Sequence, residues 1–140
     1  MSLIQIPTLT EANISTYLSG LSSVNYPVFK SFSVDDFSIP CVLVKAGKFT
    51  QIESNSGVFE GTVAVSIITQ INDVTETIQT HDDVTGAVYD AMESQDLYTS
   101  FNALGNLWNL DLSSIDQTKE ERSLISILEY SASVQNLTLD

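Results

Sequence analysis

The chain has 140 residues, which corresponds to one compact domain with enough apolar residues for a substantial core. Five Lys and Arg residues against eighteen Asp and Glu residues give a formal net charge of −13, which argues against a surface that grips nucleic-acid phosphates and against a basic membrane anchor. With 43% hydrophobic and 16% charged residues, the composition is that of an ordered globular protein. We therefore expect a single domain over residues 1–140, in which the polar residues 135–140 form a flexible tail.

The compartment is predicted from two features of the sequence. The single cysteine, Cys41, cannot form a disulfide within the chain, so nothing favours an oxidising compartment. The first residues lack the basic region and the apolar run of a signal peptide, and no apolar run reaches the ~20 residues that cross a bilayer. We therefore expect a cytosolic, non-membrane protein.

The first third of the chain is predicted to form a short helix and then extended segments. A helix that begins at Thr8 or Thr10 and ends near Gly20 places its apolar side chains on one face. The stretch 26–39 is rich in aromatic residues and is followed by Pro40, which favours extended backbone with one edge strand.

Two strands with a long connection between them follow. Residues 41–46 form an apolar run typical of a strand, and residues 62–72 alternate between apolar and polar side chains, as in a strand with one buried face. The connection, residues 47–61, is longer than a simple strand connection requires. It is either a projecting hairpin or a mobile loop.

The second half of the chain carries the clearest helix. Residues 82–94 place apolar side chains at helical spacing on one face. A looser segment with one helical turn follows at 96–105, then a short strand at 107–112 and a long strand at 122–134. This order predicts an α+β fold: a mainly antiparallel sheet of four to five strands, with two helices packed on one face and a long loop between two strands.

The sequence gives no sign of catalytic or metal chemistry. His81 is the only histidine, and we interpret it as a residue in the first turn of the helix over 82–94. Cys41 is interpreted as a small buried apolar residue. The acidic pairs 35–36, 82–83 and 120–121 are typical of solvated turns and helix N-termini, and none has the spacing of a calcium loop. We expect no enzymatic activity, no cofactor and no metal site.

The distribution of charge is the most informative anomaly. No Lys or Arg occurs between Lys48 and Lys119, whereas acidic residues are spread through that interval. One interpretation is that the charge keeps the protein soluble. The other is that the surface must not adhere to nucleic acid that moves past it.

The order of elements, from the short first helix through the strand pair with its long loop to the helix over 82–94 and the long last strand, resembles the tail terminator and related minor tail or neck proteins of long-tailed bacteriophages. The resemblance covers roughly residues 8–134. It implies a structural protein of the virion tail or neck, assembled in the host cytoplasm, that forms a ring of six on the end of the tail tube. Such a ring stops tube polymerisation, joins the tail to the head and lets DNA pass without specific binding. The implied partners are further copies of the chain, the tail tube protein and head–tail connector proteins.

A closed ring requires two different patches that meet across each interface. The exposed edges of long strands supply one kind of patch, and Phe49, Val58 and Phe59 in the long connection are the predicted anchors to a neighbouring subunit. Two alternatives stay open: a head-closure connector or other neck or minor tail component, and a small acidic module that binds a basic peptide or a cation. An enzyme with a hidden carboxylate pair is the least favoured hypothesis.

Overall fold

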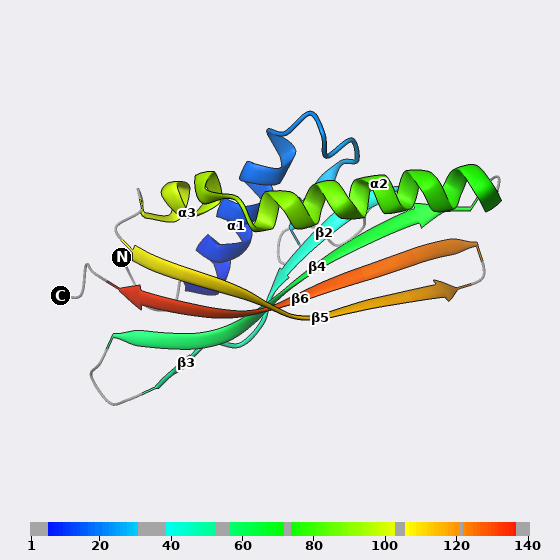
Figure 1. Ribbon diagram of the computed structural model, residues 1–140. Helices are drawn as coiled ribbons and strands as arrows, with labels where there is room; N and C mark the ends of the chain where they lie inside the picture. The colour runs from blue at the N-terminus through cyan, green and yellow to red at the C-terminus, as the bar shows by residue number, and fades with distance from the viewer. Residues whose placement is uncertain are drawn as a thin grey trace.

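Three helices lie on one face of a twisted sheet of six strands in the computed structural model, which describes residues 6–30, 39–52, 57–71, 74–102, 106–120 and 122–136 (Figure 1). The elements in chain order are α1 (Ile6–Ser19), β1 (Val28–Lys30), β2 (Cys41–Ala46), β3 (Thr50–Gln51), β4 (Val58–Gln70), α2 (Val74–Met92), α3 (Gln95–Asn102), β5 (Asn106–Glu120) and β6 (Ser123–Asn136). The predicted α+β class is confirmed. The described chain has one more helix on the covered face, and one or two more strands, than the sequence predicted.

The sheet has the strand order β1-β2-β4-β6-β5, and the short β3 pairs with the first part of β4. Among the described strands, β1 and β2 pair in parallel and the other pairs are antiparallel. The centre of the sheet is the β4–β6 pair, whose register runs from Val58 opposite Gln135 to Gln70 opposite Ser123. The long β5 therefore forms one edge of the sheet, and the short β1 and β3 lie on the other side.

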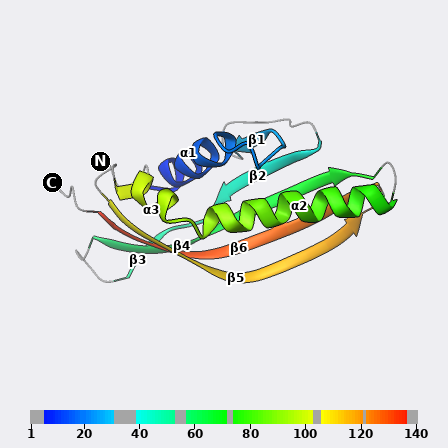
Figure 2. The same ribbon diagram turned by 45° about the horizontal axis from the view of Figure 1, so that its top comes forward.

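The core lies between the sheet and the helices that cover it (Figure 2). On β4, alternate residues Val63, Val65 and Ile67 are fully buried, and Tyr130 and Leu128 of β6 lie opposite two of them. Side chains of a strand alternate between its two faces, so one face of β4 meets the helices while the other carries half-buried and exposed residues. Full burial of each such side chain contributes about 1.5–3 kcal/mol.

A buried carboxylate fixes α1 against the sheet. Glu11 is only 1% exposed, and its Oε2 accepts a hydrogen bond of 2.9 Å from the backbone N–H of Ala46 at the end of β2. This bond satisfies a buried donor, which ties the position of α1 to the end of β2. The helix begins at Ile6, so the predicted N-caps Thr8 and Thr10 are wrong, whereas its predicted end near Gly20 is confirmed.

Further predicted boundaries also differ, among them that of the strand predicted over 62–72, which is β4 at Val58–Gln70. The second helix begins at Val74, eight residues before the predicted start, and the segment after it is a helix of eight residues, Gln95–Asn102. The strand predicted to end at Leu112 continues to Glu120. Its second half was not predicted, because a bulge between Leu112 and Ser114 shifts the alternation of apolar and polar residues. The last strand extends to Asn136, so the predicted tail over 135–140 is wrong for residues 135 and 136, which pair within the sheet, and residues 137–140 lie outside the described residues.

Candidate functional site

The only histidine lies at the centre of a buried chain of hydrogen bonds beneath α2. His81 is fully buried; its Nδ1 lies 2.7 Å from Thr69 Oγ1 of β4, and its Nε2 lies 2.7 Å from Ser126 Oγ of β6. The chain continues from Thr69 to the hydroxyl of Tyr26 at 3.0 Å, and from Ser126 to the side-chain amide of Gln117 on β5 at 3.3 Å. These bonds connect α2 with β4 and β6 beneath it. Through Tyr26 and Gln117 they also reach the segment before β1 and the strand β5.

The imidazole is held neutral by its surroundings. Burial lowers the pKa of His81, and the neighbouring carboxylate of Asp82 opposes that shift only in part. The sequence predicted a residue in the first turn of a helix, which is wrong, because α2 begins seven residues earlier and His81 faces the sheet. A polar residue at the spacing of the buried helix face was the signal that could have identified this position.

The distance between His81 and Ser126 is that of a general base and a nucleophile, but the surrounding residues are not those of a catalytic site. Ser126 is 1% exposed beneath α2, so its hydroxyl has no open path to a substrate. The group on the far side of the imidazole is the Thr69 hydroxyl, whereas a catalytic triad uses a carboxylate to stabilise the imidazolium that forms. The arrangement supports a structural role: it aligns α2 on β4 and β6 and satisfies polar groups inside the core.

The other residues weighed as candidates for chemistry do not form a common site within the described ranges. Cys41 is buried, and burial raises the pKa of its thiol, so it is an unreactive apolar side chain. The carboxylates of Asp82, Asp83 and Glu120 are exposed, whereas residues 35, 36 and 121 lie outside the described residues. Across the described ranges, no three His, Cys, Asp or Glu residues come together as a metal site. None of the helices in those ranges is both long and apolar enough to span a bilayer.

An open groove between α1 and α2 gathers part of the acidic charge. Asp82, Asp83 and Asp90 lie along its α2 side. The remaining lining residues are Tyr17, Leu21, Ser23, Gly86, Ala87, Ala91 and Ser94. The groove is wide and shallow, and a negative surface of this kind attracts basic groups.

The predicted interface residues Phe49, Val58 and Phe59 lie in and beside the β3–β4 hairpin. The hairpin was one of the two predicted forms of the long connection. Phe59 is buried in the core of the chain, and Phe49 packs against that core, while Val58 is half-buried. Most of the Phe59 surface is thus used within the subunit; whether Phe49 and Val58 contact a neighbouring subunit stays a prediction.

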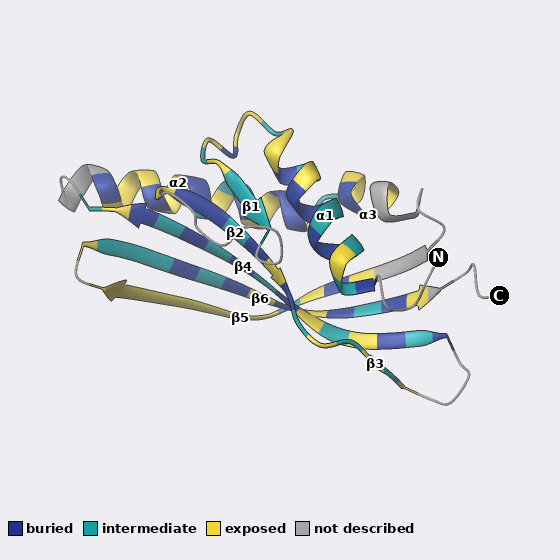
Figure 3. Cartoon of the chain, turned by 180° about the vertical axis from the view of Figure 1, so that it is seen from behind, coloured by how far each residue is buried: buried dark blue, intermediate teal, exposed yellow. Residues whose placement is uncertain are grey.

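The exposed side of β5 is the surface that sequence reasoning missed. From Asp111 to Glu120 every residue is exposed except the half-buried Leu112 (Figure 3). Ile115 is 59% exposed even though it lies opposite the fully buried Leu128. A strand edge of this length presents unpaired backbone donors and acceptors, which pair readily with another chain.

Comparison with solved structures shows a likeness in fold. No protein-family model matches the sequence, and no curated protein matches it either. Among solved structures, a chain from the virion of a native gene transfer agent (GTA) particle matches with a TM-score of 0.60 and 15% sequence identity. The match covers 89% of this chain and 93% of that chain. The two chains share a fold over nearly their full lengths.

Proposed function

We propose that this chain is a non-enzymatic structural protein of a phage-type virion, placed in the tail or neck. The observation that carries the proposal is the fold shared, almost end to end, with a chain of a gene transfer agent virion. Within that class we propose a tail terminator role: copies form a ring, six in number, on the end of the tail tube. The ring stops tube growth and joins the tail to the head through connector proteins.

The strand edges on the two sides of the sheet are suited to assembly with further copies of the chain. A ring needs a patch on one side of the subunit that fits a different patch on the other side. Among the described strands, none pairs with the outer side of the long β5, and β1 and β3 form the opposite side of the sheet. Such strand edges can extend a sheet from one subunit to the next.

The charge of the chain supports a passage for DNA. Each copy carries a formal charge of −13, so six copies form a strongly acidic ring. Acidic side chains that face a lumen repel phosphates within a screening length of about 8 Å at physiological salt. DNA therefore crosses the ring without adhering to it.

The experiment that tests this function is tube capping. Purified protein is added to tail tube protein from the same genome while the tubes polymerise, and tube lengths and ends are measured by electron microscopy. The proposal predicts shorter tubes with a ring on one end, and saturation when every end is occupied. Tubes of unchanged length with bare ends at saturating protein would contradict a terminator role, while a ring bound to isolated connector instead would favour the head-closure alternative.

A second function, a small module that binds a basic peptide, is favoured by the acidic groove between α1 and α2. Asp82, Asp83 and Asp90 line that groove. Binding of an oligolysine peptide that weakens with salt, and that Asp83→Asn with Asp90→Asn abolishes, would support the module. Asp116→Asn, an equally exposed change on β5, is the matched control.

A further inference from the structure

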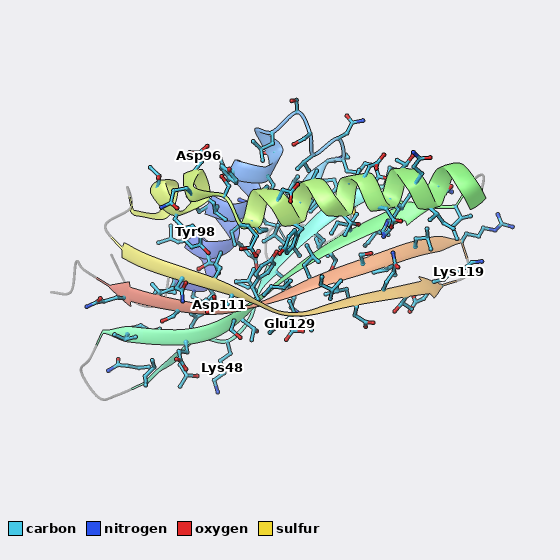
Figure 4. The ribbon with its side chains drawn as sticks, in the orientation of Figure 1. Lys48, Asp96, Tyr98, Asp111, Lys119 and Glu129 are labelled. Atoms are coloured by element: carbon cyan, nitrogen blue, oxygen red, sulfur yellow. The ribbon has the colours of Figure 1, made fainter. Side chains whose placement is uncertain are left out.

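We propose that the ring forms by a head-to-tail contact in which the β5 edge of one copy docks on the β3 edge of a second copy. The β5 edge is defined as Asp111–Glu120, and the β3 edge as residues 48–52 together with Lys45. The inference rests on the proposed ring and names its two contacting surfaces. Because the strand order places the two edges on opposite sides of β4 and β6, the same contact can repeat from copy to copy. Figure 4 labels Lys48 on the β3 edge, and Asp111 and Lys119 on the β5 edge.

The β5 edge is open over one defined stretch. At its start, the hydroxyl of Tyr98 on α3 donates a hydrogen bond of 2.9 Å to the carbonyl oxygen of Leu110, so α3 contacts the strand at that residue. Beyond it the strand is exposed to Glu120, and past the bulge it keeps a regular register with β6 from Ser114 to Glu120. The regular part is long enough to pair with another strand edge.

The charges of the β5 edge restrict what can dock there. Asp111, Asp116 and Glu120 are exposed along it, against one basic residue, Lys119. Charged side chains and bulges are the devices by which native proteins keep long edges from pairing indiscriminately. An edge that is net negative, with the exposed Ile115 between its acidic residues, fits a partner that offers positive charge around an apolar side chain.

The β3 edge offers that combination. Ile52 is 50% exposed, and its N–H donates to the carbonyl oxygen of Val58 at 3.0 Å, which fixes it beside β4. Lys45 and Lys48 are exposed. Of the described acidic residues, the exposed Glu60 lies opposite Thr50, and the buried Glu11 accepts a hydrogen bond from the backbone of Ala46. In the described part of the chain, no further strand pairs with β3.

Charge complementarity selects the second copy and the direction of docking. Pairing of β5 with β5 of another copy would bring two net negative edges together, which destabilises the pair. Docking of β5 on the β3 edge brings Asp111 and Asp116 toward Lys45 and Lys48 and lets the exposed isoleucines of the two edges meet. The contact is therefore heterologous, which is the type that closes into rings.

The test is a disulfide mixing experiment on the full chain. Ile52→Cys and Ile115→Cys place a thiol on each edge, and Ile39→Cys, at a residue 37% exposed and outside both edges, is the matched control. Cys41 stays in place, since it is buried and the wild-type chain reports any background from it. Each variant is checked for folding by thermal melting, and pairs of variants are mixed with a mild thiol oxidant while cross-linked species are followed over time.

Head-to-tail docking predicts that the 52–115 disulfide forms about tenfold faster than the 39–115 disulfide, because docked thiols have a high effective concentration. The chain with both Ile52→Cys and Ile115→Cys gives a ladder of covalent multimers. Asp116→Lys slows the 52–115 reaction, and Lys48→Glu on the other partner restores it. Equal rates for 52–115 and 39–115, or a dominant 115–115 dimer, would overturn the inference. Wild-type tube capping is measured separately, so failure of this contact and failure of the ring are distinguishable.

Discussion

Replacement of His81 by leucine removes the centre of the buried hydrogen-bond chain and puts an apolar side chain of similar size in its place. Two hydrogen bonds of 2.7 Å are lost, and a buried neutral hydrogen bond contributes about 1 kcal/mol net. The hydroxyls of Thr69 and Ser126 are not orphaned, since Tyr26 and Gln117 remain as partners. We expect His81→Leu to lower the free energy of unfolding by about 2 kcal/mol at pH 7.5, or the melting temperature by about 6–8 °C for a chain of this size.

The same residue makes this difference depend on pH. Burial lowers the folded-state pKa of His81 below its ordinary value of 6.5, so the unfolded chain binds the proton more readily. Stability from the neutral imidazole is thus fully present above pH 6.5 and is lost as the pH falls. The wild-type chain therefore loses stability through this group as the pH falls from 7.5 to 5.5. The leucine variant has no such loss.

The assay is urea unfolding of both chains at a series of pH values, followed by tryptophan fluorescence. Protonation of the many carboxylates affects both chains alike, so the difference between them isolates His81. We expect that difference, about 2 kcal/mol at pH 7.5, to become smaller as the pH falls to 5.5. A constant difference over this range, or a leucine variant as stable as the wild type at pH 7.5, would refute the role assigned to the buried chain.

Three further changes test the packing of the fold by thermal and chemical unfolding. Gly86→Ala is expected to stabilise by about 0.5–1 kcal/mol, because an added Cβ in α2 meets nothing within 4 Å and alanine favours a helix. Gly61→Ala is expected to destabilise by about 1–3 kcal/mol, since its Cβ would lie 2.7 Å from the Lys48 carbonyl oxygen and from the Phe49 ring; a neutral result would contradict this packing. Tyr130→Phe is expected to be neutral or slightly stabilising, because the buried hydroxyl has no hydrogen-bond partner in the described chain, and a loss above about 1 kcal/mol would indicate a bond to a buried water.

The sequence predicted the elements whose pattern repeats without interruption. The run at Cys41–Ala46 was located to the residue, and the alternation on β4 identified its buried face. The α2 stripe was found, but its first two turns carry few apolar residues, so the predicted start came too late. The second half of β5 was missed because the bulge breaks the alternation and its exposed residues are almost all polar.

The candidate site and surfaces depend on which distant segments of the chain meet in the fold, and the local sequence pattern does not contain that information. The sequence placed His81 in the first turn of a helix, because its partners, Thr69 and Ser126, are 12 and 45 residues away in the chain. Phe59 was predicted to project toward a neighbour, but β4 begins earlier than its alternation suggested and turns this ring into the core. That β5 lies at one edge of the sheet, and β3 on the opposite side, follows only from the strand order.

The most direct measurement for the virion role is the copy number of the chain in purified particles. Particles produced by the cells that encode the chain are banded by density, and the chain is quantified by mass spectrometry against the tail tube protein. The account predicts a small fixed number, six copies per particle, that stays with intact tails through high-salt washing. Absence of the chain from banded particles, or its full removal by the salt wash, would contradict the account.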